Sequence, residues 1–268
     1  GEVLPSIVNL NTGCPFQPFS RSPQLQYNYK FSRFNLKAAA VFQNQYRSSG
    51  PLGSKMLEYS RDAVVPEMFA GIDYRKEGFI VGVGADVLTL TPRTQSTKGE
   101  LTYKVSERNV SASLLAFASY SSEWWKLNAK TIYGQNNVHT LSLGGYGVTS
   151  IDPVTGAYDY VNFNHSTSWV NVVYGKKWQV GLFGGFTKNL GTNKPLVSSS
   201  MTYGMGMDID KLYNMSVQTD YNIKNFTIGV EYSYSVADYG TIQTATGKVT
   251  NTHAADNHRI AALCNYSF

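Results

Sequence analysis

The chain has 268 residues and a formal net charge of +5, and only 15% of its residues are charged, against 42% that are hydrophobic. That charged fraction is well below the roughly 25% of soluble domains, and no run approaches the ~20 consecutive apolar residues of a membrane-spanning helix. The net positive charge is small and the sequence has no clustered run of Lys and Arg, which argues against nucleic-acid binding. The two Cys and four scattered His lack the spacing of zinc ligands.

Residues 1–23 form an N-terminal segment that leads into the first alternating stretch. Within it, residues 2–9 could form a strand, although Pro5 disfavours a place in the middle of a sheet. The chain starts without Met, so we expect that a leader has been removed, and further sequence could be missing with it. Cys14 and Cys264 lie far apart in sequence, and we expect both to be unpaired.

One pattern occurs five times: a Tyr, a short polar turn, and an aromatic residue that opens the next alternating run. The pairs are Tyr29 and Phe34, Tyr74 and Phe79, Tyr120 and Trp125, Tyr174 and Trp178, and Tyr221 and Phe226. Subtraction of the Tyr positions gives steps of 45, 46, 54 and 47 residues. Each step accommodates two strands, one short turn and one long connection, so the pattern predicts a series of β-hairpins.

The turn aromatics always belong to the apolar face of the flanking strands, whose side chains alternate between two faces. After Phe226, for example, Ile228 and Val230 share its face, whereas Gly229 and Glu231 point the other way. Aromatic residues at one end of every apolar face are typical of the girdles of a membrane barrel, while a small soluble barrel fills its interior with apolar side chains. We therefore predict an all-β fold, a transmembrane antiparallel up-and-down β-barrel; a soluble sandwich is the alternative.

Long connections alternate with the short turns, as they do in outer-membrane barrels. They are rich in Gly, Ser, Thr, Pro and Asn, and they cover residues 47–65, 92–104, 136–165, 191–210 and 240–255. The connection at 136–165 could extend two strands as a hairpin above the membrane, or it could fold inward and narrow a pore. Short turns are periplasmic and long loops extracellular in this arrangement.

The last strand, residues 256–268, carries Ile260, Cys264 and Phe268 on one apolar face. It follows a long connection, so it ends on the same side as the short turns. Five hairpins and this strand make eleven strands, whereas bacterial single-chain barrels usually have an even number. Residues 2–9 would supply a twelfth strand; otherwise the chain is the C-terminal part of a larger barrel.

The passage into the first strand carries a short motif. Pro15-Phe16 is followed by Phe19-Ser20-Arg21-Ser22-Pro23-Gln24, which leads directly into an alternating strand. This motif, together with the barrel pattern, resembles the loop-to-strand passage of the DcaP-like porins. The resemblance implies a homotrimer of barrels with roughly sixteen strands each, of which the N-terminal strands are absent here.

Ten charged residues face inward by parity. They are Lys37, Arg47, Glu67, Asp73, Asp86, Lys126, Lys130, Asp220, Glu231 and Arg259. They could form a charged pore wall that selects solutes, or they could be solvated residues that pair with one another. Lys126 and Lys130 could form a basic patch that attracts anionic solutes. Five inward apolar residues would allow partial occlusion: Phe69, Leu115, Phe117, Trp169 and Phe183.

Catalysis has no support in the sequence. His139, His165 and His253 fall in predicted loops and His258 at the outer end of the last strand, and none lies in a nucleophile motif. We predict that the chain is not an enzyme, has no metal site and needs no cofactor.

The predicted function is that of a porin-like channel in the outer membrane of a Gram-negative bacterium, for passive diffusion of small hydrophilic solutes, with anionic solutes as a candidate class. The expected partners are the lipid bilayer and these solutes. A structural or ligand-binding barrel with an occluded lumen is the alternative. The expected aromatic girdle comprises Tyr29, Phe34, Tyr74, Phe79, Tyr120, Trp125, Tyr174, Trp178, Tyr221, Phe226 and Phe268.

Overall fold

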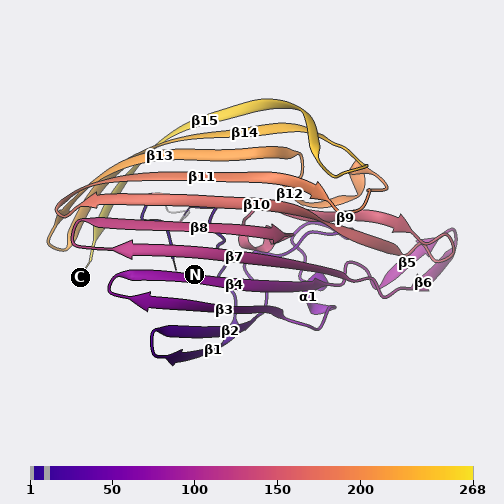
Figure 1. Ribbon diagram of the computed structural model, residues 1–268. Helices are drawn as coiled ribbons and strands as arrows, with labels where there is room; N and C mark the ends of the chain where they lie inside the picture. The colour runs from indigo at the N-terminus through magenta and orange to yellow at the C-terminus, as the bar shows by residue number, and fades with distance from the viewer. Residues whose placement is uncertain (1–2, 9–12, 268) are drawn as a thin grey trace.

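A single large antiparallel sheet dominates the computed structural model, which describes residues 3–8 and 13–267 (Figure 1). Eleven strands follow one another in the wall of this sheet, each paired with its neighbours in chain order. In spatial order they are β1 (Gln24–Phe31), β2 (Phe34–Val41), β3 (Glu67–Lys76), β4 (Phe79–Leu90), β7 (Asn109–Ser121), β8 (Trp125–Gln135), β10 (Tyr158–Gly175), β11 (Trp178–Thr192), β13 (Ile209–Ile223), β14 (Phe226–Ile242) and β15 (Val249–Tyr266). The up-and-down all-β architecture predicted from the alternation is confirmed.

All five predicted hairpins form, and their turns lie at one end of the wall (left in Figure 1). Phe31 pairs with Phe34 across the first turn, and Lys76 pairs with Phe79 across the second. In the second turn Gly78 has a φ of 79°. An added Cβ there would lie 2.2 Å from the carbonyl oxygen of Ser121, so this tight turn requires glycine.

The apolar residues of the strands lie on the outer face and remain exposed to the surroundings. Leu114 is 61% exposed and Met215 is 63% exposed, although both lie in the middle of long strands. Polar residues of the opposite parity are buried instead, among them Gln218 at 7% and Asn171 at 0%. This polarity is the reverse of a soluble core and matches a wall whose outer face contacts lipid.

The strand register brings the predicted girdle residues next to one another at the turn end. Each aromatic that opens a hairpin's second strand lies opposite an aromatic of the following strand: Phe34 opposite Tyr74, Phe79 opposite Tyr120, Trp125 opposite Tyr174, Trp178 opposite Tyr221, and Phe226 opposite Tyr266. Ring centroids are 4.6 Å apart for Trp125 and Tyr174 and 4.4 Å apart for Trp178 and Tyr221. Phe268 lies outside the described residues.

The opposite end of the wall contains more secondary structure than the sequence predicted. The connections hold the helix α1 (Glu58–Arg61), the hairpin of β5 (Gln95–Lys98) and β6 (Leu101–Lys104), the 3₁₀ turns η1 (Asn137–Thr140) and η2 (Ser199–Met201), and the short strands β9 (Gly144–Ile151) and β12 (Thr202–Met205). β9 pairs with β10 and with β12, so it extends the sheet above the wall.

The connections predicted at residues 136–165 and 240–255 end too late, because β10 already begins at Tyr158 and β15 at Val249. Residues 240–255 are not a long connection, because β14 and β15 continue to pair up to Ile242 and Val249. The threonines of this stretch suit an extended strand as well as a loop. The described residues 3–8 form no strand, so they do not supply the twelfth strand of the wall.

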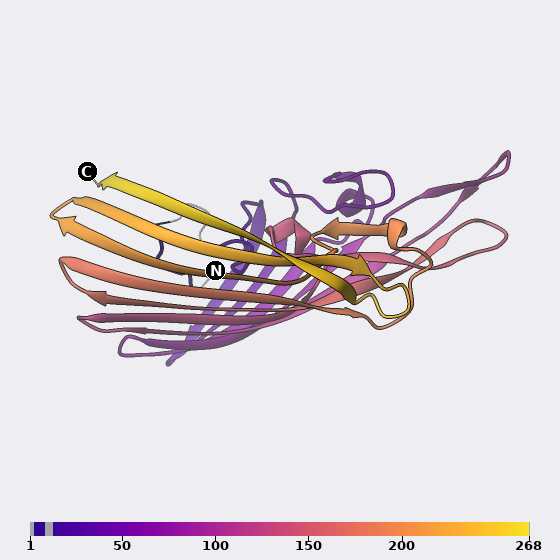
Figure 2. The same ribbon diagram turned by 90° about the horizontal axis from the view of Figure 1, so that it is seen from above.

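The wall is curved into an open trough, which Figure 2 shows from above. Within the described ranges β1 pairs only with β2 and β15 only with β14, so these two strands are its edges. The described residues contain no helix long and apolar enough to cross a membrane. Strands β3 to β15 of the wall have 10–18 residues, which meets the ~9–11 residues that a tilted membrane-spanning strand requires.

Candidate functional site

The concave face of the wall is covered in part by the N-terminal residues 3–8 and 13–22, here called the inner segment (Figure 2). Its described part has no strand or helix, so its backbone groups need partners from outside the segment. Side chains of the inner wall supply them, and the contacts below define the site.

Residues 3–8 are held by amide and carboxylate side chains from four strands. Ser6 donates its backbone N–H to Asn171 Oδ1 at 2.8 Å, and Asn171 Nδ2 donates to the Ser6 carbonyl at 3.3 Å. The N–H of Val8 donates to Gln218 Oε1 and to a Glu231 carboxylate oxygen, both at 3.1 Å. Asn128 donates to the Leu4 carbonyl at 3.1 Å. The inner wall thus replaces the sheet partners that this stretch lacks.

The second anchor is Gln17, which is 2% exposed. Its side-chain oxygen accepts hydrogen bonds from Lys130 Nζ at 2.9 Å and from Trp169 Nε1 at 3.1 Å. Lys126 Nζ also reaches the segment and donates to Ser6 Oγ at 2.6 Å. Both lysines of the predicted basic patch therefore bind the inner segment.

Phe16 packs directly onto the wall at a glycine. A Cβ added to Gly185 would lie 2.5 Å from Phe16 Cγ, so only glycine leaves room for the ring. Phe16 and Val3 form a buried cluster with Phe117, Trp169 and Phe183 of the wall.

Four of the five inward apolar residues predicted to allow occlusion belong to this region. Phe117, Trp169 and Phe183 form the cluster, and Leu115 packs against it. Phe69 lies elsewhere: its ring covers Gly71 on its own strand β3 and Gly84 on the neighbouring β4. These four side chains pack around Phe16 and Val3 of the inner segment, a partner that the sequence pattern did not identify.

The inward carboxylates are engaged rather than free. Asp73 accepts from Asn35 Nδ2 at 2.9 Å and pairs with Arg75. Glu67 lies 3.0 Å from His139 Nε2 and beside Asp86. These contacts connect the wall to η1 at the end opposite the short turns.

Two further carboxylates lie beside the inner segment on β13 and β14. Asp220 accepts from Gln218 Nε2 at 2.6 Å. Glu231 is 1% exposed, accepts from Ser233 Oγ at 3.0 Å and lies 3.8 Å from Arg259. The remaining predicted bases, Lys37 and Arg47, are half-buried.

A narrow cavity of about 150 Å³ separates the inner segment from β13, β14 and β15. Ile7, Cys14 and Phe16 line one side of it, and Glu231 and Arg259 line the other. Cys14 donates from its thiol to the Gln17 carbonyl at 3.0 Å, and burial raises the pKa of this thiol to about 11. Cys14 and Cys264 are both free thiols.

The connection after β8 has both uses that the sequence left open. η1 folds inward, where the Thr140 carbonyl accepts from the Phe19 N–H at 2.9 Å and Asn137 accepts from Ser113 at 2.9 Å. β9 instead extends upward and pairs with β10. The prediction of loop histidines is wrong for His165 and His253, because β10 already begins at Tyr158 and β15 at Val249. His139 lies in η1 within the connection, and His139 and His165 are both buried at 3% exposure.

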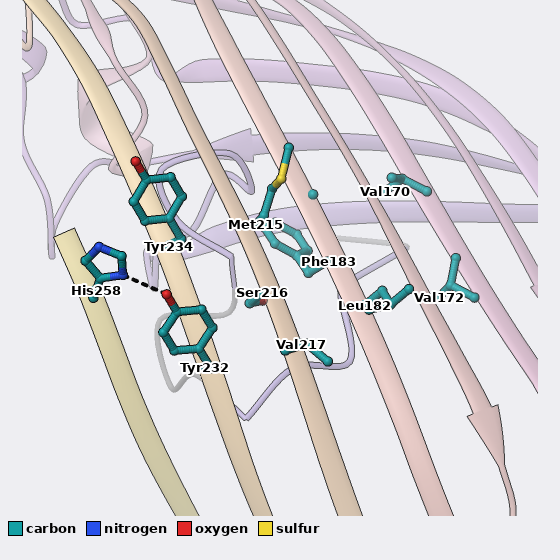
Figure 3. A pocket seen from close by; sticks show the side chains of 11 residues that line it. Val170, Val172, Leu182, Phe183, Met215, Ser216, Val217, Tyr232, Tyr234 and His258 are labelled. Carbon is teal, nitrogen blue, oxygen red and sulfur yellow. Dashed lines mark hydrogen bonds between the residues drawn. The ribbon is translucent and has the colours of Figure 1, made fainter. Parts of the chain in front are cut away.

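Another hollow lies on the opposite, outer face, a groove of about 790 Å³ across β10 to β15 (Figure 3). Val170, Leu182 and Met215 line it, and His258 Nδ1 is hydrogen-bonded to the Tyr232 hydroxyl at 2.7 Å on its flank. Most of its lining is the exposed apolar surface of the wall, and Phe183 and Ser216 line both this groove and the inner cavity. Within residues 3–8 and 13–267, no group of three or more His, Cys, Asp or Glu side chains is placed to hold a metal ion.

Comparison with protein-family models and with curated proteins found no match. Among solved structures, the outer-membrane channel DcaP of Acinetobacter baumannii is similar with a TM-score of 0.73 and 16% identity, over 100% of this chain and 68% of that one. OmpT, an outer-membrane protein of Vibrio cholerae, has a TM-score of 0.50 and 11% identity, over 91% of this chain.

This chain spans 68% of DcaP but only 63% of the OmpT chain, which is less than two thirds of its length. At these identities the likeness concerns the fold. The chain has the fold of outer-membrane β-barrel channels, and the resemblance to the DcaP-like porins predicted from its sequence is confirmed at that level.

Proposed function

We propose that residues 1–268 form one domain in the wall of a porin-like channel in the outer membrane of a Gram-negative bacterium. Small hydrophilic solutes diffuse through its lumen past the inner segment. The observation that carries this proposal is the inner wall itself: a polar, charged concave face with a segment held along it by hydrogen bonds. The exposed apolar outer face and the aromatic girdle at the turn end support insertion in a bilayer.

A channel in lipid needs a closed wall, because an unpaired backbone group in hydrocarbon costs several kcal/mol. β1 and β15 each leave one edge unpaired within the described residues. We propose that further strands pair with both edges in the assembled barrel, which agrees with the 68% coverage of DcaP. Hydrogen exchange on the native protein tests this: amides along both strands should be protected, and rapid exchange along either edge would contradict it.

Planar-bilayer recording tests the channel directly. The native protein should give stable single-channel steps, because water and ions can occupy a polar lumen. Well-folded protein that inserts without conducting would overturn the proposal.

The lumen charge supports a preference for anions at the turn end. Lys126 is exposed on the inward face, whereas the inward carboxylates Asp73 and Glu231 are buried and paired. Replacing Lys126 with Gln should lower the chloride-to-potassium permeability ratio, measured from the reversal potential in a salt gradient. An unchanged ratio would remove Lys126 from the selectivity of the pore.

An occluded barrel is the second candidate, favoured by the cluster of Phe16 with Phe117, Trp169 and Phe183 in the lumen. The double variant Phe16→Ala/Gln17→Ala removes the ring and the anchor of the inner segment. Conductance that exists only in this variant would favour an occluded barrel over an open channel. Conductance in both, larger in the variant, would favour the channel.

We also propose that the chain is not an enzyme and that it assembles as a homotrimer, as the porin resemblance implies. His258 faces outward against Tyr232, and buried His139 contacts the carboxylate of Glu67. Native mass spectrometry of the detergent-extracted protein should give the mass of three copies; a single-copy mass would refute the trimer.

A further inference from the structure

The net charge of the chain is concentrated in its five short turns, residues 30–33, 75–78, 121–124, 175–177 and 222–225. These turns contain seven of the 23 basic residues and two of the 18 acidic residues, a net charge of +5. The rest of the chain therefore carries 16 residues of each sign and is neutral. The seven basic residues are Lys30, Arg33, Arg75, Lys76, Lys176, Lys177 and Lys224.

All seven basic side chains are exposed, and the five turns lie together at one end of the wall (Figures 1 and 2). Two of the seven have carboxylate partners: Arg75 pairs with Asp73, and Lys176 pairs with Glu123. Within the described residues, Lys76, Lys177 and Lys224 contact no carboxylate. The turn end thus presents positive charge that the chain itself leaves uncompensated.

The basic groups lie at the level of the aromatic girdle. Lys177 Nζ lies 5.1 Å from the centre of the Tyr221 ring, and Lys176 Nζ lies 4.5 Å from that of Trp124. Arg33 donates to the Tyr74 hydroxyl at 3.2 Å. Aromatic girdles of membrane proteins sit among the lipid headgroups, so these cations lie at the depth of the lipid phosphates.

We propose that this basic turn rim binds the headgroups of anionic phospholipids in the leaflet that surrounds it. A Lys or Arg close to an anionic membrane surface gains about 1 kcal/mol, which is about fivefold in association. The proposal rests on the proposed function only in that the wall must span a bilayer; it does not require an open pore.

The test uses the native protein reconstituted in phosphatidylcholine bilayers that contain a small amount of spin-labelled lipid. The association constant of spin-labelled phosphatidylglycerol relative to phosphatidylcholine is measured for the wild type and two variants. The rim variant is Lys76→Gln/Lys177→Gln/Lys224→Gln. The control, Lys55→Gln/Lys194→Gln/Lys248→Gln, removes the same charge from exposed lysines of the connections at the opposite end of the wall.

The wild type should prefer phosphatidylglycerol severalfold, and high salt should weaken that preference, because the charges are exposed. The rim variant should lose up to about fivefold in selectivity for each lysine removed, and the control should keep the wild-type value. Equal loss in both variants, equal retention in both, or no preference in the wild type would each overturn the proposal. Conductance is measured on the same samples, so that failure of the lipid-binding proposal can be told apart from failure of the proposed channel.

Discussion

Gly185→Ala tests whether the inner segment controls the lumen. A Cβ at this position would lie 2.5, 2.6 and 2.9 Å from three carbons of the Phe16 ring. Carbon atoms in contact are normally about 3.5–4.0 Å apart, so the ring has to move by about 1 Å or more. Phe16 is 3% exposed and enclosed by the aromatic cluster, so it cannot move without loosening the segment.

The size of the effect follows from the cost of overpacking, which is typically about 1–3 kcal/mol. This cost acts on the contact between segment and wall rather than on the strand pairing. A loss of that size raises the fraction of molecules with a released segment by about 5- to 140-fold, since ~1.4 kcal/mol is a factor of ten. The folded wall should remain intact.

Cys14 reports on release, because its thiol lies in the inner segment and is the single reactive thiol once Cys264 is replaced by Ser. Its alkylation rate should rise in proportion to the released fraction in the Gly185→Ala variant, and the conductance should rise with it. Gly184→Ala is the matched control: its Cβ would point to the outer face, where the nearest atom, Val170 Cγ1, is 3.9 Å away.

Equal alkylation rates for the two alanine variants would refute the reasoning, because it would show that Phe16 does not depend on the space above Gly185. Faster alkylation without any change in conductance would separate the two claims. The segment would then be docked as described, yet it would not limit the flow through the lumen.

Two further predictions concern the outer connections and the buried thiol. Glu107→Ala should free the β5–β6 hairpin at a cost of about 3–5 kcal/mol, because buried Glu107 pairs with Arg93 and accepts hydrogen bonds from Tyr158 and Tyr160. Limited proteolysis of this variant should show early cleavage in residues 95–104. The control variant Glu100→Ala, at an exposed residue, should show no early cleavage there. Cys14 alkylation in the folded protein should increase with pH until about pH 11, since burial raises the pKa of the thiol to that value and only the thiolate reacts. An inflection near ~8.5, as for the urea-unfolded chain, would contradict this burial.

Much of the wall was predictable because a strand in lipid has a strict side-chain period. Tyr221 and Phe226 mark one hairpin, and the alternation on either side assigns every residue to a face. The same parity puts Lys130, Asp220 and Glu231 on one face, and in the structure Lys130 and Glu231 hydrogen-bond with the inner segment while Asp220 accepts from Gln218.

The connections at the end opposite the short turns were less predictable, because their fold depends on contacts between distant parts of the chain. Tyr59, Leu88, Leu90 and Tyr146 form one buried cluster, yet they come from three different stretches of sequence. No local period marks such a cluster. For the same reason the burial of His139 in η1 could not be inferred from a loop-like composition.

The inner segment shows a limit of parity arguments that is physical rather than statistical. An inward Asn or Gln suits a wet lumen, but it can equally satisfy the backbone of a segment that has no strand partner. Three inward amides satisfy the backbone of the segment in this way. Asn128 donates to the carbonyl of Leu4, Asn171 hydrogen-bonds with both backbone groups of Ser6, and Gln218 accepts from the N–H of Val8. The order of these three amides across β8, β10 and β13 therefore follows the path of the segment. Inward amides on successive barrel strands are accordingly candidates for docking a chain segment as much as for lining a pore.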